Sequence, residues 1–152
     1  MKRTTTKVGR FGISCQRGPS NPPIAATVES LYGVDPAFTT NLGIAAIVYM
    51  FVEPDYRGRN IGTLALEMIS FIQATTLQTD FILLVADDKS QQKQARQQQS
   101  LARWYEKHGY QRAPLLQDMM GSPNEQYGIS MIAPTNGTRI PGGEQGCRIE
   151  WW

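Results

Sequence analysis

The sequence predicts a single mixed α/β domain, and three apolar segments are the basis for this. Ile44 to Val52 and Phe81 to Val85 are uncharged apolar runs of the length and composition of buried strands. Between them, Ile61, Leu64 and Met68 recur at helical spacing. A chain of 152 residues is long enough for one proper hydrophobic core. We therefore expect one domain over residues 1–134, followed by a Gly- and Pro-rich tail over 135–152.

Composition excludes several classes of function. A net charge of +2 is too small to indicate binding to nucleic acid or a membrane surface, and no apolar run is long enough to span a bilayer. One histidine and the lack of clustered acids argue against a metal site. The two cysteines, Cys15 and Cys147, are read as free thiols of a reducing compartment, which predicts a cytoplasmic protein.

The N-terminal third is predicted to form strands. Its first 28 residues are basic, with no acid before Glu29, which is similar in composition to an organelle transit peptide, so targeting stays open. No amphipathic helical pattern supports that reading, and we interpret Lys7 to Ser14 as a strand followed by a loop. Ile24 to Tyr32 is read as the next strand, antiparallel to the one that begins near Ile44.

A basic turn joins the central strand to the helix that follows. Pro54 lacks a backbone donor and closes the strand, while Gly58 and Gly62 let the backbone approach a ligand closely. The first amides of a helix have no intrahelical partner and lie at the positive end of its dipole. With the side chains of Arg57 and Arg59, they predict an anion site, most plausibly for phosphate.

Two sequence motifs resemble those of the GNAT superfamily of acyl-CoA-dependent N-acyltransferases. Arg57-Gly58-Arg59-Asn60-Ile61-Gly62 is similar to the acyl-CoA signature, except that Asn60 stands where the family usually has glycine. Asparagine is the non-glycine residue that best tolerates a left-handed backbone. Ala102 to Tyr110, with Tyr105-Glu106-Lys107 before Gly109, resembles the second acyl-CoA element, and Gln98 takes the place of a family asparagine.

The resemblance implies a mostly antiparallel sheet with helices on both faces and a gap between two diverging strands for the pantetheine arm. It implies acetyl-CoA as cosubstrate, no metal, and direct transfer to a small-molecule or peptide amine. Tyr105 would protonate the departing sulfur. The residues implied to bind the donor are Phe51, Val52, Arg57, Gly58, Arg59, Asn60, Ile61, Gly62, Thr63 and Gln98.

The acceptor side departs from the family. GNAT proteins place two helices between the first two strands, and the chain leaves no room for them between Ser14 and Ile24, so we expect these helices to be shortened or missing. The acceptor site would then be open or completed by a second subunit, a possible homodimer. No general base is evident; Glu53, Tyr49, Asp87 and Asp118 are the weak candidates. His108 is interpreted as structural, at a helix C-terminus.

The C-terminal half of the predicted domain also contains a polar segment and two further strands. Asp87 to Gln99 is a polar, Gln-rich loop or the exposed start of a helix, and Tyr110 to Leu116 and Tyr127 to Ala133 are the last strands. The alternative function is a non-catalytic acyl-CoA-binding module of the same fold. A nucleotide-binding domain is a third reading, weakened because the phosphate-loop pattern Gly-x-x-x-x-Gly-Lys-Ser/Thr is missing.

Overall fold

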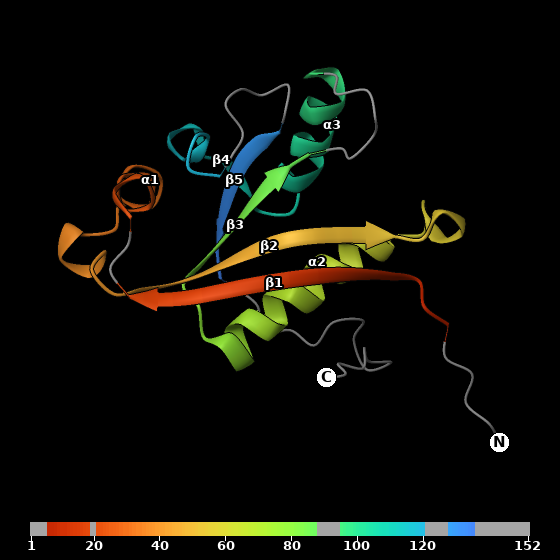
Figure 1. The fold of residues 1–152 in the computed structure, drawn as a ribbon, viewed down its shortest axis with the longest axis horizontal. Coiled ribbons are helices and arrows are strands. Elements are labelled where there is room, and N and C mark those ends of the chain that lie inside the picture. The colour runs from red at the N-terminus through yellow and green to blue at the C-terminus, as the bar shows by residue number, and fades with distance from the viewer. Residues whose placement is uncertain (1–5, 19–20, 88–94, 121–127, 136–152) are drawn as a thin grey trace.

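The protein is built on one five-stranded sheet (Figure 1). The computed structural model describes residues 6–18, 21–87, 95–120 and 128–135. The strands are β1 (Gly9–Gly18), β2 (Leu42–Val52), β3 (Phe81–Ala86), β4 (Gln111–Arg112) and β5 (Ile129–Pro134). Their order is β1-β2-β3-β5-β4, in which only the β2–β3 pair is parallel. The predicted mixed, mostly antiparallel sheet is confirmed.

Helices cover both faces of the sheet, as expected. On one face, α2 (Ile61–Ile72) and α3 (Ala95–Glu106) bury Leu66, Ile69 and Ala102 in a cluster with Ala45 and Ile82. On the other face, α1 (Pro22–Tyr32) and the 3₁₀ turn Pro114–Leu116 bury a second cluster. Its members from these elements and the sheet are Ile24, Val28, Leu116, Ile44 and Leu83. Neighbouring strand residues thus serve opposite faces, as the strand period requires.

The expected strand over Ile24 to Tyr32 is wrong, because this segment is helix α1. Ile24, Val28 and Tyr32 are four residues apart, which fits both the alternation of a strand and one face of a helix. The prolines at the start decide between them, since a helix tolerates proline in its first turn. Gly33, with φ of 64°, ends the helix in the left-handed conformation. Between β1 and β2 the chain therefore forms one helix and a 3₁₀ turn, Pro36–Phe38.

Several boundaries also differ from expectation. β1 runs four residues beyond Ser14, and it is β1 that pairs antiparallel with β2. The expected strand Tyr110 to Leu116 shrinks to β4, because Pro114 cannot donate to a ladder and starts a 3₁₀ turn instead. α2 ends in a π-helical turn, Gln73–Leu77. Most of the Gln-rich segment, the tail from residue 136 and Cys147 lie outside the described residues.

The central strand β2 leaves its parallel neighbour halfway along its length. Its pairing with β3 covers three residue pairs and ends at Ala46 and Leu83. Beyond that point β2 pairs with β1 alone, and β2 and β3 diverge (Figure 1). The pairing with β1 shifts register where Gly12 faces Tyr49 and Ile13 faces Ile47, which leaves Val48 as an extra, bulged residue. The resemblance implied the gap between the two strands.

No helix in the described ranges is long and apolar enough to cross a membrane.

Candidate functional site

The site forms where β2 ends and α2 begins. The first intrahelical hydrogen bond of α2 runs from the Leu64 amide to the Asn60 carbonyl, at 3.1 Å. Within the described chain, Asn60 does not cap the helix with its side chain, and the first turn holds no acid. The amides of Ile61, Gly62 and Thr63 therefore remain available to an external acceptor at the positive end of the helix dipole.

Two residues with positive φ shape the turn before the helix. Gly58 has φ of 77°, a value that glycine adopts without steric cost. Asn60 has φ of 58° and ψ of 20°, in the left-handed region. Asparagine thus holds the backbone in the conformation for which the related motif uses glycine. Asn60 therefore differs from the motif in residue type but keeps the left-handed backbone conformation at this position.

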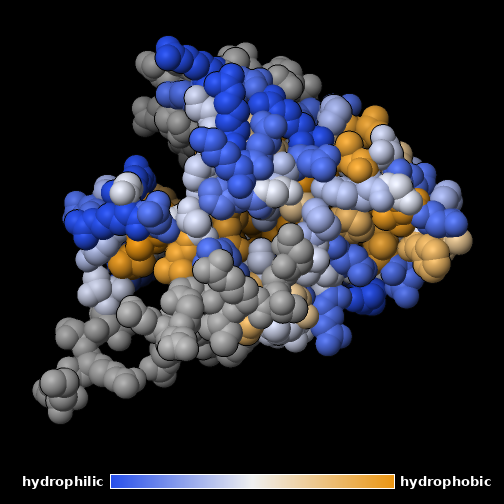
Figure 2. Space-filling view, turned by 180° about the vertical axis from the view of Figure 1, so that it is seen from behind, coloured by the Kyte–Doolittle hydropathy of each residue, from blue (hydrophilic) through white to orange (hydrophobic). Residues whose placement is uncertain are grey.

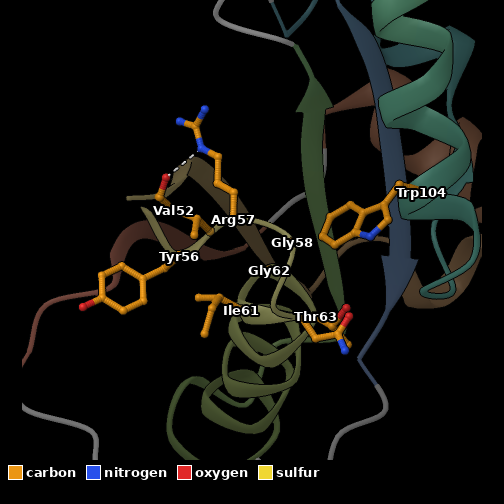
Figure 3. A pocket seen from close by; sticks show the side chains of 9 residues that line it. Val52, Tyr56, Arg57, Gly58, Ile61, Gly62, Thr63 and Trp104 are labelled. Atoms are coloured by element: carbon orange, nitrogen blue, oxygen red, sulfur yellow. Dashed lines mark hydrogen bonds between the residues drawn. The ribbon is translucent and has the colours of Figure 1, made fainter. Parts of the chain in front are cut away.

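A pocket of about 260 Å³ opens at this helix start (Figure 3). It is lined by Val52, Tyr56, Arg57, Gly58, Asn60, Ile61, Gly62, Thr63 and Trp104. Seven of these are among the predicted donor-binding residues, which the fold brings together from the end of one strand and the start of one helix. None of the nine is an acid or a histidine. The pocket therefore suits an anion held by backbone amides.

The guanidinium groups of the two arginines in the turn lie against aromatic rings. Arg57 donates from Nε to the carbonyl oxygen of Val52 at 3.0 Å (Figure 3). Its guanidinium lies 5.5 Å from the ring centre of Phe51. Arg59 stacks on Tyr56 at 5.4 Å. Both contacts are of the cation–π type, and they hold the guanidinium groups on aromatic rings. In this arrangement the backbone amides, more than the arginines, offer hydrogen-bond donors to the pocket.

Trp104 is a pocket residue that is not among the donor-binding residues predicted from the sequence. It comes from α3 and lies across the pocket from the start of α2 (Figure 3). A Cβ atom on Gly62 would lie 3.2 Å from its ring, a tight contact, so the glycine lets the ring lie close to the first turn of α2. The signal that could have found it is the second motif itself, which puts a large aromatic residue directly before Tyr105.

His108 links the two helices behind the pocket. Its Nδ1 lies 2.8 Å from the carbonyl oxygen of Trp104, and its Nε2 lies 3.1 Å from the Thr63 hydroxyl. The imidazole also stacks on the Trp104 ring, with centroids 4.7 Å apart. Gly109, with φ of 93°, follows it at the end of the helix. The structural role expected for His108 now has a specific form, because it fixes one pocket residue from each helix.

Tyr105 lies behind the pocket and does not line it. It is 6% exposed and belongs to the buried cluster that includes Leu66 and Leu84. Its ring packs edge-on against Trp104 at 4.9 Å and Tyr110 at 5.5 Å. Burial raises the pKa of Tyr105 to about 12, because the phenolate is poorly solvated there. Tyr105 is thus a neutral donor at physiological pH and a weaker acid than a free phenol.

The other predicted residues do not line the pocket. Gln98 is fully buried on α3 and donates from Nε2 to the Asp87 carboxylate at 3.0 Å, just after β3. Of the other weak base candidates, Asp118 and Tyr49 are exposed, and Glu53 follows β2 half-buried. The identity of the base stays open. Among the described residues, no group of three or more potential metal ligands gathers in one place.

Comparisons with known proteins identify the family. A model of the acetyltransferase (GNAT) domain matches residues 24–112, more than half of the chain. A search of curated proteins by sequence found no match. A solved bacterial toxin aligns over 84% of this chain and 60% of its own, with a TM-score of 0.55 and 13% identity. A GNAT-like decarboxylase, GphF, solved with isobutyryl-CoA, aligns over 90% of this chain and 76% of its own, with a TM-score of 0.50 and 16% identity. These structures share the fold, and the matching domain model shows that the chain belongs to the GNAT acetyltransferase family.

Proposed function

We propose that the protein is an N-acetyltransferase that moves an acetyl group from acetyl-CoA directly to a primary amine of a small molecule or peptide. The observation that carries the proposal is the start of α2. There, the amides of Ile61, Gly62 and Thr63 are open to the pocket that the left-handed turn at Gly58 and Asn60 shapes. Such a cradle suits the pyrophosphate of a CoA thioester.

The diverging strands supply a place for the reacting end. Past Ala46, the edge of β2 that faced β3 no longer pairs with it, and the bulge at Val48 re-aims the backbone there. Backbone N–H groups of this segment would donate to the thioester oxygen as negative charge develops on it. Ile47 and Met50 pack against the cluster that contains Tyr105, so the tyrosine is on the same side of the sheet.

In the proposed reaction, the neutral amine attacks the thioester carbon, the C–S bond breaks, and the departing sulfur receives a proton. The raised pKa of Tyr105 means that it holds its proton at physiological pH and stabilises the sulfur chiefly as a hydrogen-bond donor. The proton that the amine loses must leave to water or to a base still to be identified, because none of the side chains that line the pocket is a carboxylate or a histidine.

The second candidate is a non-catalytic acyl-CoA-binding module. It is favoured by the pocket's lack of acid and histidine side chains and by the single α1 helix on the acceptor side. The fold of GphF, which is named as a decarboxylase, also shows that this architecture is not confined to acetyl transfer.

The proposed acceptor side exposes apolar side chains on α1 and the two 3₁₀ turns nearby, Leu31, Phe38 and Leu115. Figure 2 shows hydrophobic side chains at the end of the molecule that carries α1.

The test measures release of the free CoA thiol from acetyl-CoA with a panel of amines and short peptides. We expect Tyr105→Phe to lower turnover by about a hundredfold, the lower range for removing a general acid, with donor affinity within about twofold. Tyr110→Phe is the matched control, since Tyr110 is equally buried and packs against Tyr105. Donor binding without thiol release for any acceptor would favour the binding module, and full turnover in Tyr105→Phe would contradict the role of this tyrosine.

A further inference from the structure

The imidazole of His108 and the hydroxyl of Thr63 form a hydrogen-bonded pair at the wall of the pocket. Thr63 lines the pocket from the first turn of α2, and His108 reaches it from the end of α3 at 3.1 Å. The other imidazole nitrogen, Nδ1, is 2.8 Å from the Trp104 carbonyl. A carbonyl oxygen can only accept, so Nδ1 carries a proton and donates it.

That constraint fixes what the other nitrogen can do. In a neutral imidazole Nε2 has no proton, so it accepts and the Thr63 hydroxyl donates to it. The hydroxyl then offers only lone pairs to the pocket, which an anion avoids. When the imidazole gains a proton, Nε2 donates to the Thr63 oxygen instead. The hydroxyl hydrogen is thereby released and can turn toward an anion held at the helix start.

We propose that His108 is a positioning residue that acts through Thr63 and makes affinity for the phosphates of the donor increase as the pH falls. This inference rests on the proposed function, since it assumes that the amides at the start of α2 hold those phosphates. Histidine side chains in general change charge between pH 5 and 8, which is the range over which the proposal is tested.

The imidazole is hydrogen-bonded to the Trp104 carbonyl and the Thr63 hydroxyl, and both helices also carry charged residues. On α2 the charged residue is Glu67, one turn beyond Thr63. On and after α3 the nearest in sequence are Arg103, Glu106 and Lys107, and Glu106 pairs with Arg112 at 3.1 Å. Among the described residues, neither carboxylate forms an ion pair with His108. An effect of these charges on the imidazole would not depend on the Thr63 hydroxyl and would therefore persist in a variant that lacks it.

A purely structural link between the helices would predict something different. A link that only holds α2 against α3 would change stability with pH, with no change in donor affinity. A direct effect of the imidazolium charge would change affinity with pH, whether or not a hydroxyl stood at position 63. The proposed switch requires the hydroxyl, so the pH dependence of affinity in variants at this position separates the three possibilities.

The experiment is calorimetric titration with dephospho-CoA between pH 5.5 and 8. This ligand lacks the 3′-phosphate, and its pyrophosphate stays ionised throughout the range. We expect the unmodified protein to bind about threefold to tenfold more tightly at pH 5.5 than at pH 8, the net worth of one ordinary hydrogen bond. Thr63→Val should remove this difference, and Thr63→Ser should restore it. Thr75→Val is the matched control, since the Thr75 hydroxyl bonds to the Phe71 carbonyl at the far end of α2 and should leave the difference intact.

A second measurement reads the imidazole directly. His108 is the single histidine of the chain, so its NMR signals are unambiguous. Ligand should raise the midpoint of its titration in the unmodified protein and leave it unchanged in Thr63→Val, as linkage requires. Equal affinity across the pH range, or an undiminished difference in Thr63→Val, would overturn this inference alone. Failure of the unmodified protein to bind dephospho-CoA and acetyl-CoA at any pH would overturn the proposed function as well.

Discussion

The two ends of β2 differ sharply although both are apolar. At the first end Leu42, Ile44 and Ala45 are buried, and β2 has a partner strand on each side from Ile44 to Ala46. At the far end β2 pairs with β1 alone, and Val48 and Tyr49 are 63% and 49% exposed. The comparison shows that neighbours decide burial here. One strand anchors the core at its start and provides a free backbone edge at its end.

Truncating a side chain at each end tests this difference most strongly. We expect Ile44→Ala to lower the free energy of unfolding by about 2–5 kcal/mol, because Ile44 is 5% exposed and its loss leaves a cavity. Val48→Ala on the same strand should change it by less than about 0.5 kcal/mol. Denaturant unfolding followed by circular dichroism measures both. Equal losses in the two variants would mean that the far end is as well packed as the first.

Alkaline unfolding probes the buried wall beside the separated end. Burial raises the pKa of Tyr105 to about 12, against 10.0 for a free tyrosine. The unfolded chain therefore loses this proton first, so stability holds below pH 10 and falls as the pH rises to 12, by roughly 2–3 kcal/mol. Urea unfolding at pH 8, 10 and 11.5 should show a smaller fall in Tyr105→Phe. Parallel curves for the two proteins would contradict the burial of this phenol.

A smaller loss of stability than at Ile44 or Tyr105 is expected at the turn after the exposed end. Asn60→Ala should cost about 1 kcal/mol, since alanine is strained in the left-handed conformation that Asn60 adopts. Asn60→Gly should restore the stability to within a few tenths of a kcal/mol and keep donor affinity. Thermal unfolding and acetyl-CoA titration of the two variants make the comparison. An alanine variant as stable as the glycine variant would show that the turn has another conformation in solution.

The strand, the turn and the helix around the pocket were well predicted because the sequence signals for them are local. The apolar runs, Pro54, and the glycines and Asn60 of the turn act on their own backbone, so β2, α2 and the open helix start follow from neighbouring residues. The helix α1 was missed because its apolar residues fit two periods. The exposed end of β2 could not be predicted from apolarity either, since its exposure depends on where β3 diverges, which only the family resemblance implied.

Contacts between side chains from distant segments could not be predicted from the sequence either. The stacking of Arg57 on Phe51 and the placement of Trp104 over Gly62 depend on how the turn and the helices meet in space. The motif predicted that Phe51, Arg57 and Gly62 would belong to one site, but not that Trp104 would line it or that the arginines would turn to aromatic rings. The roles of the predicted site residues, including Tyr105, remain predictions for experiment.

The central claim is that the start of α2 holds the phosphates of the donor. It is tested most directly by calorimetric titration of acetyl-CoA and free CoA into the unmodified protein and Gly62→Asp. A carboxylate there would face the phosphates, so we expect affinity to fall by at least about a hundredfold. The fold should persist, because an acid suits a helix N-terminus. Gly62→Ala, which brings only a methyl group to 3.2 Å from Trp104, should weaken binding less. Unchanged binding of either ligand to folded Gly62→Asp would contradict the account.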